Sequence, residues 1–293
     1  MLRTISGCVF ILLLGHGADA QHSSGLGQLD TNYVKDYSHL IAGRIFGSTK
    51  FNTLTIRGNG PVNDLRYRPN NQYNLGVGVS YRKLTLNLGF RAPFVNDDDN
   101  IYGKTRYLDA QANMFSPERA SNLFLQYFQG YHLVSHRPGT FSWMDEDTDL
   151  PYRSDVREFN AGVSTLRMLN STRFSYRAAF NQDAWQRKSQ GSWMVGGYAV
   201  YYSVRGDSSV VPATQRDLFP ERASIRISDF GDAGLLGGYA YTEVLGSHFF
   251  LTGSLAVGAG LSVHHIIAEV AKGDEEFLSF GPGAHIQARA GIG

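Results

Sequence analysis

The residues best placed for chemistry are Ser262 and His264, which lie two apart in the segment "LTGSLAVGAGLSVH" (251–264). Residues two apart on a β-strand share a face, so this serine and this imidazole could serve as nucleophile and base. A lipid-hydrolysing enzyme would also need an orienting Asn or Asp from a neighbouring strand. Such pairs arise easily by chance on a strand that faces a polar interior, so we assign no catalytic residue.

Metal-binding patterns are weak in this chain. His264 and His265 are adjacent and would point to opposite faces of a strand, and no HExxH motif is present. The acidic run at 145–149 resembles the start of a calcium loop, but Leu150 and Val156 stand where an EF-hand needs Gly and Glu. We expect no metal centre and no cofactor. With residues 97–99, the run is expected to form a solvated acidic rim. Loose binding of divalent ions by this rim, beside lipopolysaccharide, is a hypothesis that the acidic side chains leave open.

Charged residues also occur at the polar positions of alternating segments. Buried charges need partners, so two interpretations stay open. The charges could belong to a salt-bridge network that plugs the interior, or they could line a path that favours anionic solutes. The residues expected to line the lumen are Arg91, Glu158, Arg173, Arg177, Ser262 and His264.

The elements that carry these residues are β-strands with period-2 alternation. The clearest hairpin has an apolar face that consists of Tyr73, Leu75, Val77, Val79 and Tyr81, then Leu84, Leu86, Leu88 and Phe90. Other expected strands are 38–46, 50–57, 62–69, 104–115, 121–133, 158–164, 173–181, 191–205, 234–246, 251–264 and 281–292. No convincing helical stripe is visible, although 214–222 could form one short turn of helix.

The connectors between these strands are of two kinds. Short ones lie at 82–83, 116–118 and 170–171, and long polar ones lie at 92–103, 135–154 and 183–190. Short turns on one rim and long loops on the other are typical of outer-membrane barrels. The 33 glycines fit a polar face that lines a curved, crowded interior.

A soluble β-protein would show the same alternation, with its apolar face inward. Three features favour lipid outside instead. The apolar row of the first strand has an aromatic residue at each end, Tyr73 and Tyr81. A tilted row of this length spans roughly 20 Å, close to the apolar band of such barrels. The opposite face is rich in Gly, Ser, Asn and Arg. We therefore expect the nine apolar residues of this hairpin to face lipid.

The beginning of the chain predicts export. Arg3 precedes an apolar stretch from Cys8 to Leu14, and Ala18-Asp19-Ala20 is a small-residue cleavage site. We expect a signal peptide at 1–20, a periplasmic segment at 21–35 and a barrel domain at 36–293. Cleavage would remove Cys8, which is the one cysteine, so no disulfide would stabilise the mature chain. The net charge of +1 gives no reason to expect nucleic acid as a partner.

Three segments carry a family resemblance: "YVKDYSHLIAGRIF" (33–46), "LRYRPNNQYNLGVGVSYRKLTLNLGF" (65–90) and "GGYAYTEVLGSHFFLTGSLAVGAGLS" (237–262). They resemble domain-of-unknown-function family 4421, a family of outer-membrane proteins from Bacteroidota-type Gram-negative bacteria. The resemblance implies a barrel in the bacterial outer membrane, in contact with its lipid, its lipopolysaccharide and its assembly machinery. It implies no established activity and transfers no catalytic residue.

The fold expected from these observations is an all-β, antiparallel transmembrane barrel of about 12–14 strands. The strands above give about thirteen, an odd number, and the chain ends "AHIQARAGIG" without a terminal aromatic, so we expect that a last strand or two is missing. If every short turn lies on one rim, 206–233 must contain a further crossing, for which 223–230 is the candidate.

Three functions compete for such a barrel. We rank first a narrow channel or transporter for small solutes. A sizeable, conducting lumen would support this function. The alternative is a structural or interaction barrel with a plugged lumen and partner-binding outer loops. The third is a lipid-modifying enzyme.

Overall fold

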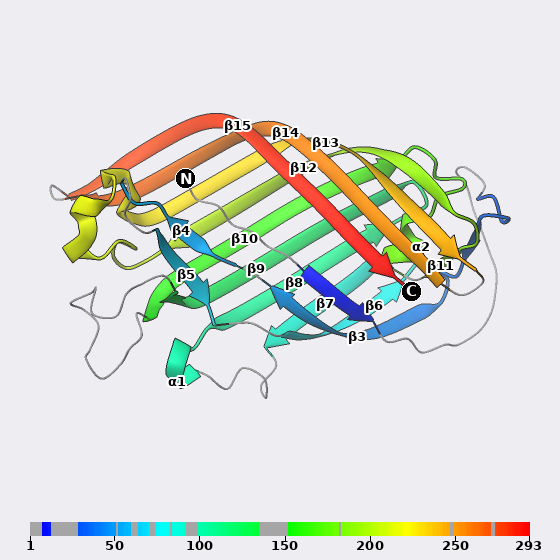
Figure 1. The fold of residues 1–293 in the computed structure, drawn as a ribbon, viewed down its shortest axis with the longest axis horizontal. Helices are drawn as coiled ribbons and strands as arrows, with labels where there is room; N and C mark the ends of the chain where they lie inside the picture. The colour runs from blue at the N-terminus through cyan, green and yellow to red at the C-terminus, as the bar shows by residue number, and fades with distance from the viewer. Residues whose placement is uncertain are drawn as a thin grey trace.

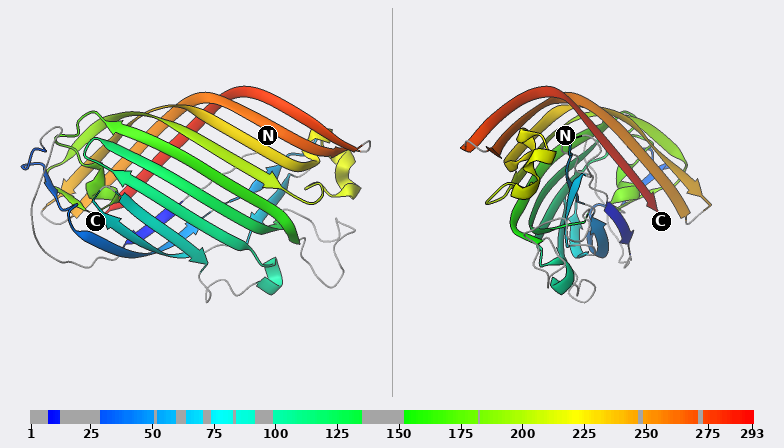
Figure 2. Two further views of the ribbon diagram at one scale, coloured as in Figure 1. Left: turned by 180° about the vertical axis from the view of Figure 1, so that it is seen from behind. Right: turned by 60° about the vertical axis from the view of Figure 1, so that its left-hand side comes forward.

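The computed structural model describes residues 8–12, 29–50, 52–59, 64–70, 74–82, 84–91, 99–134, 152–181, 183–246, 249–270 and 273–293. Most of these residues belong to one strongly curved antiparallel sheet that bends around an interior (Figures 1 and 2). The protein is therefore all-β, as the alternation predicts. None of the described helices has the length and apolarity that a membrane crossing requires.

The wall of the sheet consists of strands that follow one another in chain order. They are β3 (Ile41–Lys50), β6 (Asn74–Tyr81), β7 (Leu84–Arg91), β8 (Arg106–Phe115), β9 (Arg119–Leu133), β10 (Tyr152–Met168), β12 (Gln190–Arg205), β13 (Ile225–Leu245), β14 (Phe249–Val270) and β15 (Gly273–Ile292). Every neighbouring pair is antiparallel. We call these strands the wall.

Shorter elements lie beside the wall or on its concave side. β1 (Cys8–Leu12) pairs with β3, β4 (Leu54–Ile56) pairs with β5 (Leu65–Pro69), and β2 (Val34–Asp36) pairs with β11 (Ala184–Gln186). β5 also pairs with the end of β9. The helical elements are α1 (Asp99–Tyr102), α2 (Tyr176–Phe180), and the 3-10 helices η1 (Ala213–Leu218) and η2 (Glu221–Ala223). The short helical turn expected at 214–222 is confirmed.

The hairpin of β6 and β7 has the register that the sequence predicts, with Val77 opposite Leu88 and Val79 opposite Leu86. Cross-strand pairs on one face then share their polarity, so both apolar rows lie on the same side of the sheet. Arg82 in the connecting turn has a φ of 53°, the left-handed conformation that tight hairpin turns use.

The connections alternate between two rims. At one rim, which we call the short-turn rim, β6 ends and β7 begins, β8 ends and β9 begins, and β13 ends and β14 begins. At the opposite rim, which we call the long-loop rim, β7 ends and β8 begins, and β9 ends and β10 begins. Residues 183–190 were expected on the same rim as the other long connectors, and this was wrong. This segment lies on the short-turn rim, between the end of β10 and the start of β12, because those two wall strands pair directly with each other.

The strand expected at 173–181 is also wrong. Residues 176–180 form α2, and Ser175 caps this helix by accepting a hydrogen bond from the Ala178 amide. Alternating large and small residues in "FSYRAAF" imitate a strand, but this segment is buried on nearly all sides rather than on one face. A period-2 pattern is informative only where one side of the chain meets a different environment.

Two further boundaries differ from those expected. β3 extends to Lys50, so only Leu54–Ile56 of the expected strand 50–57 forms a strand, β4. Residues 225–230 form the first part of β13 rather than a separate crossing. With 173–181 removed from the count, consecutive wall strands alternate in direction, and no extra crossing is required.

The two ends of the sheet path are β1 and β15. Within the described residues, no hydrogen-bonded pairing joins β15 to β3 or β1. β1 comes from the segment 1–20, which is expected to be a signal peptide. The other positions of that segment lie outside the described residues. The expected domain boundary at 35/36 falls inside β2.

Glycines on the concave face make room for larger inward side chains. The ring of Phe46 occupies the space that a side chain at Gly76 would fill, and the Arg44 and Asn87 side chains do the same at Gly78. The sequence predicts this role for glycine, because a closely curved polar face has little room for side chains.

Candidate functional site

The convex face of the wall is apolar. Val77, Val79 and Tyr81 on β6 are exposed, while Asn74 and Ser80 on the same strand are buried. On β7, the exposed residues Leu84, Leu86, Leu88 and Phe90 alternate with inward-facing Thr85, Asn87 and Gly89. Leu75 is half-buried, and Tyr73 lies outside the described residues. The sheet is therefore inverted relative to a soluble protein, in which the apolar face would form the core.

The lumen residue Glu158 lies on β10 with its side chain inward and buried. The Tyr131 hydroxyl donates to its Oε2 at 2.8 Å, and the Asn160 amide donates to its Oε1 at 2.7 Å. Neutral donors thus hold this carboxyl group, and no ion pair to it is found in the described part of the chain. The buried, inward position of Glu158 on a wall strand agrees with the expectation for this residue.

The two arginines expected on the strand 173–181 have different surroundings. The Arg173 side chain is 55% exposed and lies near Asp30 at 3.7 Å, so it does not line the lumen. Arg177 is buried, but it projects from α2 rather than from a wall strand. Arg91 ends β7, and its side chain is outside the described positions.

Residues 169–189 and β2 form what we call the helical plug; the exception within this range is Gln182, which is not described. Phe174 and Tyr176 of the plug pack among inward-facing wall residues from β8 to β14. The full cluster is Phe115, Ala120, Leu166, Met168, Phe174, Tyr176, Met194, Tyr198, Val200, Leu236, Ala240 and Ala256. The helical plug therefore fills the interior near the short-turn rim.

An ion pair lies inside the helical plug. Arg177 Nε lies 3.0 Å from Asp183 Oδ1, and Arg177 Nη2 lies 3.0 Å from Asp183 Oδ2. Asp36 of β2 contacts the same Nη2 at 3.2 Å. Burial raises the pKa of the Asp183 carboxyl, and the Arg177 guanidinium opposes that shift. Arg177 thus joins α2 to the residue directly before β11 and, through Asp36, to β2.

Asn181 connects the helical plug to the wall. Its Oδ1 accepts from Thr85 Oγ1 at 2.6 Å and from Arg44 Nη2 at 2.8 Å, and its Nδ2 donates to Asp183 Oδ2 at 2.6 Å. On the other side of the interior, the Tyr176 hydroxyl lies 3.3 Å from Ser254 Oγ on β14. The helical plug thus spans the interior from β3 and β7 to β14.

A second plug fills the interior near the long-loop rim. β4, β5 and residues 206–224 form what we call the loop plug, which buries apolar side chains against β9, β10, β12 and β13. This cluster is Leu54, Ile56, Leu65, Tyr67, Phe128, Tyr131, Leu133, Val156, Val204, Val210, Val211, Phe219, Ala223 and Ile225. The Tyr67 hydroxyl donates to the Val210 carbonyl at 2.7 Å, which joins the two parts of the loop plug.

Polar side chains separate the two apolar clusters. In addition to the Glu158 group, Gln126 donates to Asp109 at 3.1 Å, and the Tyr198 hydroxyl donates to Asp232 at 3.1 Å. These contacts join neighbouring strands across the concave face. They correspond to the buried salt-bridge and hydrogen-bond network that was one of the two interpretations of the lumen charges.

Ser262 and His264 both lie on the inward side of β14 but are engaged separately. The Ser262 hydroxyl donates to the Gly281 carbonyl at 3.2 Å, whereas His264 Nε2 lies 2.9 Å from Ser228 Oγ. Sequence spacing places the two residues on one face, but their hydrogen bonds point to different neighbouring strands. This geometry does not assemble a nucleophile with its base.

The acidic run at 145–149 lies outside the described residues, and so do Asp97 and Asp98; Asp99 begins α1. In the described ranges, no group of three or more His, Cys, Asp or Glu side chains is arranged to hold a metal ion.

Sequence reasoning missed Arg44, Asn181 and Asp183, whose side chains join the helical plug to the wall and to Arg177. Asp183 was placed in a loop, and Asn181 at the end of an expected strand. For Asn181 and Asp183, the available signal is the segment "FNQD" (180–183), because Asn and Asp are typical of helix caps and turns. Such residues favour a compact connection over a membrane crossing.

Two of the three comparisons with known proteins found nothing: no curated protein and no solved structure matches this chain. A family model described as a domain of unknown function (DUF4421) matches residues 28–293, which include the whole wall and both plugs. The chain therefore belongs to the DUF4421 family.

Proposed function

We propose that this protein is an outer-membrane β-barrel whose own chain closes its lumen, and that it acts as a structural or interaction protein through its long-loop rim. The support for a membrane location is the inverted polarity of the wall, with exposed Val79 and Leu86 outside and buried Ser80 and Thr85 inside. Water would not favour so large an exposed apolar surface. Lipid and lipopolysaccharide would cover this surface after insertion by the outer-membrane assembly machinery.

The observation that carries the choice of function is the helical plug. Phe174 and Tyr176 lie packed among inward wall residues, and Arg177 and Asp183 are each 5% exposed. A solute path along the axis would have to displace these side chains and separate a buried ion pair, which is strongly unfavourable. Because the two plugs fill the interior near both rims, we favour the plugged barrel. The narrow channel, which the sequence alone ranks first, has less support.

The enzyme alternative has the weakest support. It requires Ser262 to donate to His264, whereas the two side chains bond to Gly281 and to Ser228 respectively. A channel retains one argument, since the polar belt between the plugs contains the carboxyl groups of Asp109, Glu158 and Asp232.

Single-channel recording in planar bilayers tests the proposal. Purified full-length protein should give no steady openings, whereas a variant that releases the helical plug, Arg177→Ala combined with Asn181→Ala, should give openings. Steady, solute-selective openings of the unmodified protein would overturn the closed-barrel function. Recovery of the protein in the outer-membrane fraction, with heat-modifiable migration, tests the membrane location separately.

A further inference from the structure

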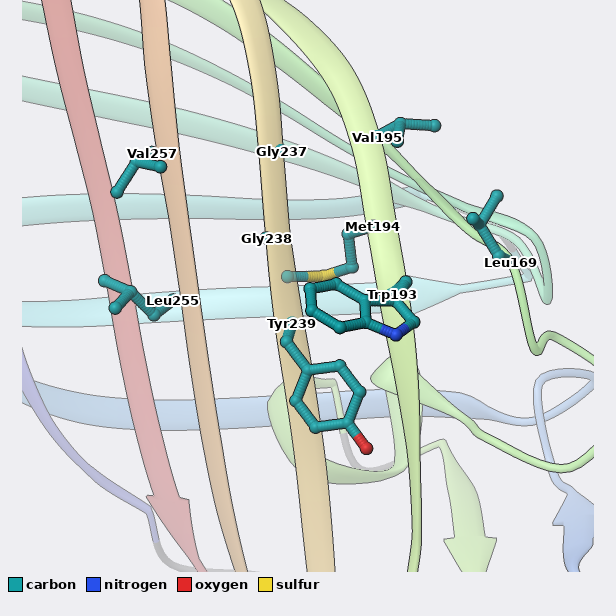
Figure 3. Close-up of a pocket in the computed structure, with 9 residues that line it drawn as sticks. All are labelled: Leu169, Trp193, Met194, Val195, Gly237, Gly238, Tyr239, Leu255 and Val257. Carbon is teal, nitrogen blue, oxygen red and sulfur yellow. The ribbon is translucent and has the colours of Figure 1, made fainter.

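An apolar groove of about 630 Å³ lies on the convex face of β12, β13 and β14 (Figure 3). Its lining includes Trp193, Val195, Gly237, Tyr239, Leu255 and Val257. Ligand sites for small molecules commonly have volumes of about 300–1,000 Å³. The groove is therefore large enough for part of a lipid molecule.

The groove exists because Gly237 lacks a side chain. Strand register places Val195 and Val257 on either side of Gly237, so two side chains flank an empty strip of backbone. A Cβ atom built at Gly237 would meet no atom within 4 Å. Substitutions at this position can therefore fill the groove without straining the wall.

Aromatic rings close one end of the groove. Trp193 and Tyr239 are cross-strand neighbours whose ring centroids lie 5.1 Å apart at an interplanar angle of 62°. In Figure 3, the Tyr239 hydroxyl points away from Gly237, toward Gly191 near the start of β12. Tyr and Trp with an apolar body and a polar tip are typical of membrane interfaces. This end of the groove lies next to the short-turn rim.

Two arginines lie beside this groove on the same face. Arg167 is the cross-strand partner of Val195, and Arg119 is the partner of Arg167. The Arg167 side chain is 58% exposed, and its Nη2 lies 3.7 Å from Glu118 Oε2, which is the one acidic group within ion-pair distance of these two arginines in the described residues. Two guanidinium groups and one carboxylate leave a net positive charge next to an apolar groove, which is complementary to a phosphate attached to an acyl chain.

We propose that this groove binds a glycerophospholipid with an anionic headgroup, such as phosphatidylglycerol, from the leaflet at the short-turn rim, which in outer-membrane barrels is the periplasmic one. One acyl chain lies over Gly237 between Val195 and Val257, and the phosphate lies beside Arg119 and Arg167. This inference deepens the proposed function, because it rests on the convex face being in lipid. It assigns one defined lipid position to a face that otherwise meets lipid without preference.

The test uses folded full-length protein in detergent, with Trp143→Phe and Trp185→Phe so that Trp193 is the remaining tryptophan. Phosphatidylglycerol with a brominated acyl chain is titrated, and quenching of Trp193 fluorescence measures binding. Gly237→Leu should weaken binding about tenfold. Gly43→Leu is the matched control, since Gly43 is also outward and a Cβ there meets no atom within 4 Å.

The headgroup contacts have their own arm. Arg119→Gln combined with Arg167→Gln should weaken phosphatidylglycerol binding about tenfold and leave the binding of a brominated diacylglycerol unchanged. Arg157→Gln, at the long-loop rim, is the control. Native mass spectrometry should count one fewer retained phospholipid on the Gly237→Leu protein.

Three outcomes would overturn the inference: equal quenching with leucine at position 237, equal affinity for diacylglycerol and phosphatidylglycerol, or a preference for lipopolysaccharide. Each can occur while the protein still fractionates with the outer membrane. A failure of the lipid site is therefore distinguishable from a failure of the membrane assignment.

Discussion

The Arg177 guanidinium and the Asp183 carboxylate form a two-contact ion pair inside the helical plug, with both N–O distances at 3.0 Å and each side chain 5% exposed. Arg177 comes from α2, and Asp183 lies directly before β11, so the pair fixes the turn between them. Because both side chains are buried, water cannot compensate for the loss of the pair.

The first prediction concerns this pair. Arg177→Met should destabilise the helical plug by about 3–5 kcal/mol, because it leaves Asp183 buried without its cation. Hydrogen exchange in 169–189 should rise while exchange in β13 and β14 stays slow. Asp183→Asn is the comparison variant and should have a smaller effect, since Asp36 still contacts Arg177 at 3.2 Å. Equal exchange in all three proteins would contradict the plug's dependence on the pair.

The second prediction concerns Glu158. Glu158→Ala should lower the free energy of unfolding by about 1–3 kcal/mol, because the Tyr131 hydroxyl loses its acceptor and the Asn160 amide loses its partner. Glu158→Gln should cost less, since it retains one acceptor oxygen and the volume of the side chain. Urea unfolding of the protein in lipid vesicles measures both values. A more harmful glutamine than alanine would show that the negative charge itself is required.

The third prediction tests the environment of the convex face. Val79 is 54% exposed, so Val79→Arg would be nearly neutral for a face in water. In a bilayer the same change should cost about 2–4 kcal/mol near the midplane. Folding into lipid vesicles, followed by heat-modifiable migration, measures the difference. Arg157→Lys at the long-loop rim is the control, and a neutral Val79→Arg would remove the membrane assignment.

The fourth prediction compares glycines on the two faces of the wall. Gly76→Leu should destabilise the protein by about 1–3 kcal/mol, because the Phe46 ring already occupies the space of the new side chain. Gly43→Leu points outward into open space and should leave the free energy of unfolding almost unchanged. Similar losses for both variants would mean that the concave face is less tightly packed than these contacts imply.

The fifth prediction concerns the unassembled nucleophile. A fluorophosphonate probe should not label Ser262, because its hydroxyl donates to the Gly281 carbonyl while His264 is bonded to Ser228. Mass spectrometry of the treated protein in detergent checks this. Labelling of Ser262 that disappears with His264→Ala would revive the enzyme alternative.

Local polarity alone was enough to predict the wall. Alternate side chains of a strand point to opposite faces. In the segment 73–90, the polarity of each residue therefore indicates which face of the sheet its side chain lies on. The same reasoning predicted the inward position of Glu158 and the space-making role of Gly76 and Gly78.

The plugs could not be predicted in this way. Residues 173–181 are surrounded by other parts of the chain on nearly all sides, so their pattern contains no contrast between two faces, and the apparent alternation misled the strand assignment. Asn181 meets Thr85 and Arg44 across 96 and 137 positions of sequence, and such meetings depend on the curvature of the whole sheet. The sequence by itself thus determined which face of each strand is apolar. The tertiary structure decided what occupies the interior, because only the curvature of the wall brings distant polar and aromatic side chains into contact.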